Sequence, residues 1–390
     1  MKVPIVKIYF DEAEEELLLD TLRSGWIVQG TRVKAFEDAF SHWTGAEFAA
    51  AVSSCTTGLH LSLAALGIGP GDEVIVPSFT YIATANAVEH TGATPVFCDV
   101  DIETYNIDPR SFEEKITERT RAVIPVHLFG LAAEMDPIVD VCAARGISIV
   151  EDAACGLGSR YHGRHVGTIG DLGCFSFHPR KIITTAEGGM IIGKDRSYEE
   201  TIRSLRDHGA RKSDFDRHAD SKPMMLPDFE FAGFNYRMTD LQGALGVAQM
   251  KKLDEILKGR RDRAAVYDDR LKGIPSVKIP VVPHGCEHGY QSYVIRIVEG
   301  DKARVDEESI KRAEKRRNSI IEKLESLGIS TRQGTHAVHT LSYYRKKYGM
   351  EPMELFGSLV CDHTSIALPL YPNMSEDEQE YVIDSLLSMV

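Results

Sequence analysis

The sequence has no hydrophobic run long enough to cross a membrane, and its first eight residues lack the apolar core of a signal peptide. Its seven cysteines are scattered, and no two of them form a Cys-x-x-Cys pair. Such pairs are typical of zinc and iron–sulfur sites, whereas unpaired cysteines suit a reducing compartment. We therefore expect a cytoplasmic protein with no membrane segment and no bound metal. The histidine pair His336 and His339 has no further convincing ligand beside it in the sequence.

An excess of positive charge is also missing, because 58 acidic residues outnumber 45 lysines and arginines to give a net charge of −13. Nucleic-acid phosphates are bound by basic faces, so the charge argues against a general nucleic-acid binder. Anionic small molecules remain possible substrates, since a local pocket can oppose the global charge. Apolar residues are not scarce: 43% of the chain is hydrophobic, as in an ordinary globular protein. A chain of 390 residues can build one large core and a smaller second one.

Short β-branched runs alternate with helical patterns between Phe48 and Ile192. The runs predict strands at 73–77, 95–100, 122–126 and 147–152, with helices at 59–66, 82–91 and 136–145. Continuous apolar strands that alternate with helices predict an α/β fold with a mostly parallel sheet covered on both faces. Ligands of such sheets bind beyond the carboxyl ends of the strands. Four polar residues follow predicted strands and are expected at that edge: Ser78, His127, Asp152 and Ser176.

A smaller α+β region is expected in the C-terminal third of the chain. One long helix over 241–271 would bridge to it, followed by strands at 277–282 and 291–297 and a charged helix over 304–327. Residues 214–228 hold two prolines and mixed charges, which favours a surface loop. We therefore predict a large domain over 1–252 and a small domain over 253–390.

Lys181 is the residue that says most about function. It lies between an apolar, strand-like run and a threonine-rich turn. Most lysines are solvated surface charges, but an amine whose pKa is lowered by burial or neighbouring charge can form a Schiff base with a carbonyl. Asp152, at the end of another predicted strand, either pairs with a protonated ring nitrogen or caps a helix that begins at Ala153. Together the two residues suggest the two ends of a pyridoxal phosphate (PLP) site.

Further residues have a chemical interpretation beside a structural one. Ser53–Gly58 precedes a helical pattern, and hydroxyls with free N–H groups at a helix start can hold a phosphate or simply cap the helix. Ser176 is placed to reach the same phosphate. Tyr81 either stacks on a planar cofactor ring or belongs to the core.

Taken in order, seven motifs resemble those of the DegT/StrS-type sugar aminotransferases, which are fold-type I PLP enzymes. The resemblance covers the chain from about Ser24 to the C-terminus. The motifs are 24–30, 53–56, 67–81, 151–154, 175–181, 187–189 and 233–240. This family resemblance implies that the mostly parallel sheet is of the seven-stranded type.

The resemblance implies a role for each matching residue. Lys181 would bind the cofactor covalently, Asp152 would pair with the pyridine nitrogen, and Tyr81 would stack on the ring. Thr56 and Ser176 would hold the phosphate. Asn235 and Arg237 would reach that phosphate from the partner subunit of a homodimer. Weaker substrate contacts are implied for Trp26, His208 and the region of His336. Residues 328–344 hold arginine, histidines and tyrosines that suit sugar or diphosphate contacts, so we expect Arg332 and His336 to line the acceptor site.

Two positions depart from the family pattern. Cys55 stands where a glycine is usual, and because cysteine is small we expect the phosphate cradle to survive. Cys155 stands where Gln or His usually lies near the phenolic oxygen of the cofactor, and a thiol is a poor hydrogen-bond partner.

The implied reaction moves an amino group from an amino acid, L-glutamate, to a nucleotide-linked keto sugar. The acceptor would be a 4-keto-6-deoxy or 3-keto hexose, and the product an amino sugar for glycan, O-antigen or antibiotic biosynthesis. A cyclitol (inosose) aminotransferase is the nearest alternative. A PLP-dependent sugar dehydratase is disfavoured because those relatives carry histidine in place of the lysine. A non-catalytic regulatory protein would not need the lysine, the aspartate and the phosphate cradle together.

Overall fold

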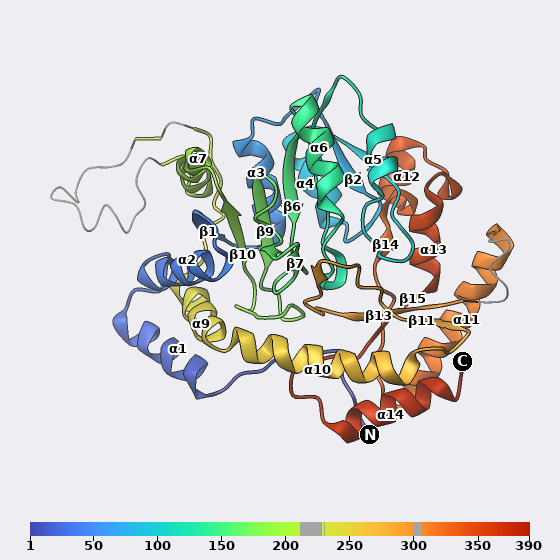
Figure 1. The fold of residues 1–390 in the computed structure, drawn as a ribbon. Helices are drawn as coiled ribbons and strands as arrows, with labels where there is room; N and C mark the ends of the chain where they lie inside the picture. Colours follow the sequence, from blue (N-terminus) through green and yellow to red (C-terminus); the bar gives the residue numbers. More distant parts are fainter. Residues whose placement is uncertain (211–227, 230, 299–305) are drawn as a thin grey trace.

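A seven-stranded sheet forms the centre of the molecule (Figure 1). The computed structural model describes residues 1–210, 228–229, 231–298 and 306–390. Only β10 runs antiparallel to its neighbours, so the sheet is mostly parallel, as the sequence predicts. In spatial order the strands are β1 (Phe48–Val52), β10 (Gly189–Gly193), β9 (Leu172–Ser176), β6 (Ser148–Asp152), β5 (Thr120–Val123), β2 (Glu73–Pro77) and β4 (Thr94–Cys98).

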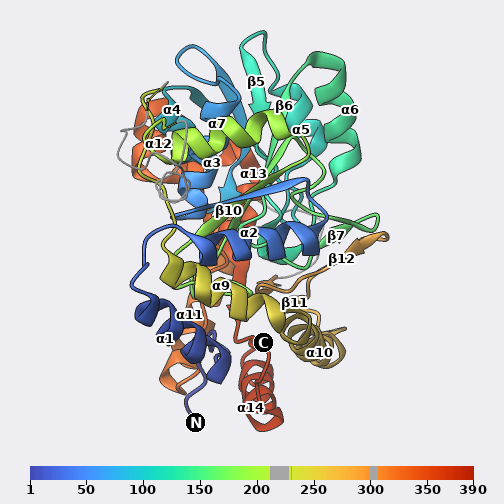
Figure 2. The same ribbon diagram turned by 90° about the vertical axis from the view of Figure 1, so that its left-hand side faces the viewer.

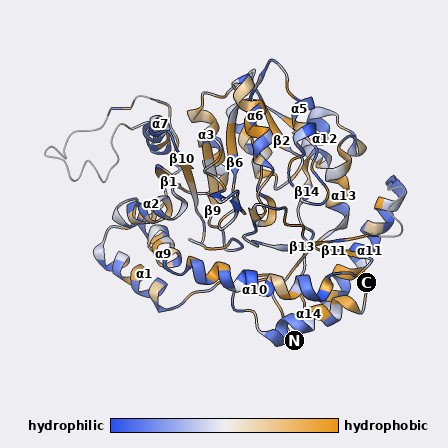
Figure 3. Cartoon of the chain, viewed as in Figure 1, coloured by the Kyte–Doolittle hydropathy of each residue, from blue (hydrophilic) through white to orange (hydrophobic). Residues whose placement is uncertain are grey.

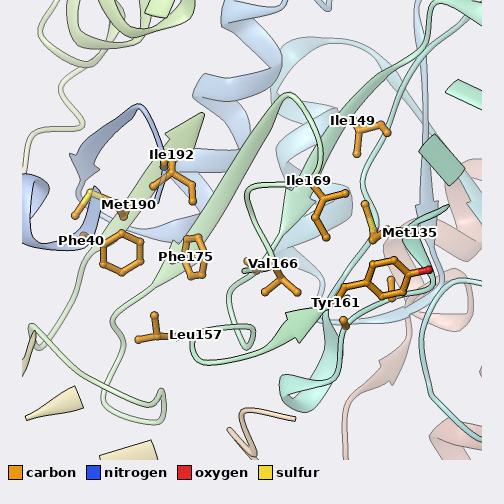
Figure 4. Close-up of a cluster of buried hydrophobic side chains, with 14 of the residues drawn as sticks. Phe40, Met135, Ile149, Leu157, Tyr161, Val166, Ile169, Phe175, Met190 and Ile192 are labelled. Atoms are coloured by element: carbon orange, nitrogen blue, oxygen red, sulfur yellow. The ribbon is translucent and has the colours of Figure 1, made fainter. Parts of the chain in front are cut away.

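Both faces of this sheet are buried. Successive strand residues point to opposite faces, so each strand contributes side chains to two cores. Along β10, Met190 and Ile192 enter one core and Ile191 enters the other. The first core includes Phe40 and Phe175 (Figure 4). It is covered by α2 (Thr31–Thr44), α5 (Pro109–Glu114) and α6 (Met135–Arg145), and the second core by α3 (Cys55–Ala65), α4 (Ala83–Thr91) and α7 (Arg196–Arg206).

Hydropathy follows this layering. The central strands are predominantly hydrophobic, whereas the outer helices α1 (Glu12–Ser24), α10 (Leu253–Leu271) and α14 (Glu376–Leu387) carry extensive hydrophilic surfaces (Figure 3). In the described part of the chain, no helix combines the length and apolarity that a membrane crossing requires.

The C-terminal third builds a second core around a small antiparallel sheet. The sheet consists of β11 (Val277–Lys278), β13 (Tyr293–Ile297) and β15 (Ser365–Leu368). Helices α10, α11 (Glu307–Ser326) and α14 contribute to its core (Figure 2). Val3 is also part of this core, and its N–H donates to the Gly328 carbonyl (2.9 Å). The first residues therefore pack with the C-terminal region, and the division at residue 252 stays a prediction.

Short paired segments join the two regions. β14 (His336–Ala337) pairs with β3 (Phe79–Thr80), and β12 (Cys286–Glu287) pairs with β7 (Arg160–Tyr161), which pairs with β8 (Arg164–His165). Helices α12 (Ser342–Tyr348) and α13 (Phe356–Thr364) follow β14.

The long helix predicted over 241–271 is two helices, α9 (Asp240–Lys251) and α10, separated at Lys252. Lys252 has φ −114° and ψ 13°, outside the helical range, and its ammonium pairs with Asp11 and Glu14, each at 2.8 Å. The predicted helix over 304–327 begins at Glu307, because Asp306 and Ser309 form a capping box there. The loop predicted at 214–228 lies outside the described residues except for Asp228.

Candidate active site

A cavity of about 540 Å³ lies where β6 and β9 end, between the large sheet and the small one. Asp152 is the last residue of β6, and Ser176 is the last residue of β9. Eight of the residues singled out in the sequence line this cavity: Cys55, Thr56, Tyr81, Asp152, Cys155, Ser176, Lys181 and Arg332.

Lys181 lies in the loop after β9, where its N–H donates to the His178 carbonyl (2.8 Å). Its Nζ donates to Cys155 Sγ at 3.2 Å. Burial by itself lowers the pKa of Lys181, but Cys155, Cys55 and Asp152 outweigh burial and raise that pKa above its usual value. A lysine amine must lose its proton before it can attack a carbonyl.

Asp152 is buried and fixed by two hydrogen bonds. Thr84 Oγ1 donates to Oδ2 at 2.8 Å, and the Ala154 N–H donates to Oδ1 at 3.1 Å. Thr84 is held in turn by Thr80 at 3.0 Å. The helix-cap interpretation of Asp152 is wrong, since a turn rather than a helix follows it. An ionised carboxylate still has free acceptor sites after two bonds, so Asp152 can accept from a further N–H group.

The N-terminus of α3 supplies free backbone donors to the same cavity. Ser54 caps the helix by accepting from the Thr57 N–H (3.2 Å). The N–H groups of Cys55 and Thr56 lie in the first turn, where a helix has no internal partner for them. This is the arrangement that binds phosphate at helix N-termini. Gly189 packs directly behind it: a Cβ on this residue would lie 2.6 Å from the Cys55 nitrogen.

A buried hydrogen-bonded pair supports the strand that carries Asp152. Glu151 accepts from His127 Nε2 at 2.8 Å and from the N–H groups of Gly167, Ile169 and Gly170. The Ala133 N–H donates to His127 Nδ1, so the ring proton is on Nε2. Burial by itself raises the pKa of Glu151, but the His127 hydrogen bond and the backbone amides lower it below its ordinary value. His127 therefore has a structural contact and does not line the cavity.

Comparison with known proteins agrees with this geometry. The sequence profile of the DegT/DnrJ/EryC1/StrS aminotransferase family matches residues 9–387. The chain belongs to this family. It is 38% identical to the spore coat polysaccharide biosynthesis protein SpsC of Bacillus subtilis, over 97% of this chain and 94% of that protein. It is 36% identical to the GDP-perosamine synthase of Caulobacter vibrioides, over 99% of this chain and 97% of that protein.

Solved structures give the same result. The putative sugar aminotransferase Spr1654 of Streptococcus pneumoniae, in its PMP-form, superimposes with a TM-score of 0.91 at 30% identity. The match covers 100% of this chain and 99% of that one, and the same protein is also known in a PLP-form. The predicted fold, the predicted aminotransferase activity and the predicted PLP cofactor are thereby confirmed.

Five residues predicted for this aminotransferase site do not line the cavity: Asn235, Arg237, Trp26, His208 and His336. Arg237 pairs with Asp207 at 2.5 Å, and the His208 N–H donates to the Phe234 carbonyl. His336 is an exposed residue of β14, and Trp26 donates to the Gln29 carbonyl. Their roles in binding stay predictions. Ser78, expected at the sheet edge, is buried against His339 (2.6 Å) outside the cavity.

Several residues of the site carry no signal that was recognised in the sequence. Thr84 does not line the cavity but holds Asp152, and its place near the start of the predicted helix over 82–91, three residues after Tyr81, could have pointed to it. Arg180 lines the cavity and stands beside Lys181 at the end of the motif over 175–181. Arg260 and Gln291 come from distant segments, and no local pattern marks them. Across the residues that the structure describes, no group of three or more His, Cys, Asp or Glu side chains could hold a metal ion.

Proposed function

We propose that this aminotransferase moves an amino group from L-glutamate to a nucleotide-linked keto sugar, a 4-keto-6-deoxy or 3-keto hexose. The observation that carries the proposal is the meeting of Lys181, Asp152 and the α3 N-terminus in one cavity of about 540 Å³, room enough for a cofactor and a substrate. The names of the relatives, which include a GDP-perosamine synthase, support a sugar acceptor. The seven unpaired cysteines support a reducing, cytoplasmic location.

The residues fit PLP. The N–H groups of Cys55 and Thr56, with Ser176, would hold its phosphate; Asp152 would pair with its ring nitrogen, and Lys181 would bind it covalently. When bound, PLP supplies an electron sink that stabilises negative charge at the α-carbon of the donor. The Lys181 amine would act as the general base that accepts the α-proton of the donor, and it would deliver that proton to C4′ of PLP. Asp152 would keep the ring nitrogen protonated and so maintain the electron sink.

We further propose that the active unit is a homodimer, in which Asn235 and Arg237 complete the partner subunit's site. Two observations support this arrangement. Asn235 is exposed and does not line the cavity of its own chain. Exposed apolar side chains lie in α1 and in the segments around residues 27–28 and 229–231: Leu19, Leu22, Ile27, Val28, Phe229 and Phe231.

A panel of nucleotide keto sugars incubated with glutamate and the purified enzyme tests the acceptor. Mass spectrometry should show exchange of the keto oxygen for an amine on at least one nucleotide sugar, with 2-oxoglutarate formed alongside. Lys181→Ala, the matched control, should give no product. Amination of an inosose but of no nucleotide sugar would favour the cyclitol alternative. Loss of a hydroxyl without gain of nitrogen would favour a dehydratase.

A further inference from the structure

Positive charge gathers in the cavity of this acidic protein. Four of the lining residues are cationic (Arg180, Lys181, Arg260 and Arg332) and two are anionic (Asp152 and Glu187). Lys181 and Asp152 are the residues proposed to hold PLP, so three arginines face one carboxylate. This local excess opposes the net charge of −13 and points to an anionic ligand.

Arg260 is the most telling of the three, because it is 2% exposed and forms no ion pair with any acid in the described part of the chain. Its guanidinium donates to the carbonyls of Tyr290 (2.8 Å) and Gln291 (2.5 Å), which fixes its position from α10. Burial lowers its pKa to about 10, and no neighbouring charge opposes that shift. An unpaired buried cation is costly unless a ligand pairs with it. Arg260 therefore marks a site that an anion would stabilise.

Arg180 and Arg332 extend this cationic surface toward Lys181. Gln291, whose carbonyl accepts from Arg260, also donates its side-chain amide to the Arg180 carbonyl (2.8 Å). Arg332, an exposed residue that precedes β14, lines the same cavity as Arg180. Among the described residues, neither arginine has an ion-pair partner.

We propose that Arg180, Arg260 and Arg332 form the carboxylate-binding subsite for a dicarboxylic amino donor. The inference rests on the proposed function and deepens it. Arg180 adjoins Lys181 in the chain and lines the same cavity, so this charge lies beside the covalent centre. An amino donor carries a carboxylate on the carbon that bears its reacting amine. The diphosphate of a nucleotide sugar is separated from the keto carbon by the sugar ring. Arginine forks bind carboxylates in a bidentate manner.

Calorimetric titration of the PLP-loaded enzyme with glutarate, a dicarboxylate without an amine, tests the subsite apart from turnover. Arg180→Gln and Arg332→Gln should each weaken glutarate binding by roughly tenfold or more, as expected for loss of a charge-assisted pair. Both variants should bind UDP, GDP and TDP with affinities within about twofold of wild type, because these ligands have no carboxylate for the arginines to bind. Arg110→Gln, an exposed arginine paired with Asp108, is the matched control and should change neither affinity. Arg260 is not substituted, because its guanidinium holds the cavity wall through hydrogen bonds to the Tyr290 and Gln291 carbonyls.

Unchanged glutarate affinity in both cavity variants would overturn the proposal, as would a wild-type enzyme that binds no glutarate. Weakened nucleoside diphosphate binding with intact glutarate binding would also overturn it, because the anion would then be the diphosphate of the acceptor. These outcomes differ from failure of the proposed function, which would appear as no aminated nucleotide sugar despite normal glutarate binding.

Discussion

At the residue scale, a few polar contacts hold Asp152 and Lys181 in place at the two ends of the proposed cofactor site. Asp152 is held by Thr84, and Lys181 by Cys155. The sequence could predict Lys181, Asp152 and the α3 N-terminus because each follows a recognisable strand or precedes a recognisable helix. It could not predict the raised pKa of Lys181, because that shift depends on Cys55, Cys155 and Asp152, which only the fold brings together.

Thr84→Val should slow the conversion of the PLP-bound enzyme by glutamate roughly tenfold, since a hydrogen bond to a charged group contributes about 1.5–3 kcal/mol. Without the Thr84 hydroxyl, Asp152 is free to turn away from the ring nitrogen. The rate is measured from the absorbance change of the cofactor on adding glutamate. Thr44→Val removes another buried hydroxyl, bonded to the Phe40 carbonyl far from the cavity, and should leave the rate unchanged. Equal rates in wild type and Thr84→Val would refute the role given to Thr84.

Glu151→Gln tests the buried pair behind Asp152. The folded pKa of Glu151 is lowered, so the unfolded state binds protons more strongly. The stabilisation from this carboxylate is therefore fully present above the unfolded pKa of about 4.3 and is lost as pH falls through the folded pKa. At neutral pH the variant should lose about 3 kcal/mol of unfolding free energy, because the backbone amides lose hydrogen bonds to a charged group. Urea unfolding at a series of pH values should show the difference from wild type shrinking below about pH 4. A difference independent of pH would contradict this account.

At the scale of elements, predicted types were right and several boundaries were wrong. The four strands and three helices predicted for the large sheet and its cover follow from apolar periodicity, which acts locally; β1 and β10 were not predicted. The break between α9 and α10 does not, because it depends on Lys252 reaching Asp11 and Glu14 across the fold. Likewise, the close approach of β10 to α3 is visible only in three dimensions, although Gly188 and Gly189 hint at it.

Gly189→Ala should disturb the phosphate cradle more than the fold. The new methyl would lie 2.5 Å from the Ser54 carbonyl carbon and 2.6 Å from the Cys55 nitrogen, so α3 must shift. We expect PLP to dissociate at least roughly tenfold faster, the effect of losing about 1.4 kcal/mol of binding. Gly193→Ala on the same strand meets only side-chain atoms of Phe48 and Leu172 as its nearest contacts, and serves as the control. Dialysis followed by cofactor absorbance measures the loss. Equal retention in the two variants would show that the cradle does not depend on this contact.

At the scale of the whole molecule, the fold places residues from both ends of the chain around one cavity. Alternating strands and helices predicted the sheet, and the ordered motifs predicted the family. The cavity wall formed by Arg260, Gln291 and Arg332 could not be predicted, because it depends on how the small sheet packs against the large one. The same packing brings Val3 into the C-terminal core.

Borohydride trapping followed by peptide mass spectrometry tests the central claim most directly. With PLP bound, reduction should leave a pyridoxyl adduct on Lys181. Addition of glutamate before reduction should remove that adduct, because the donor takes the place of Lys181 on the cofactor. Lys181→Ala should carry no adduct under either condition. An adduct on a different lysine, or one on Lys181 that glutamate does not remove, would contradict the account.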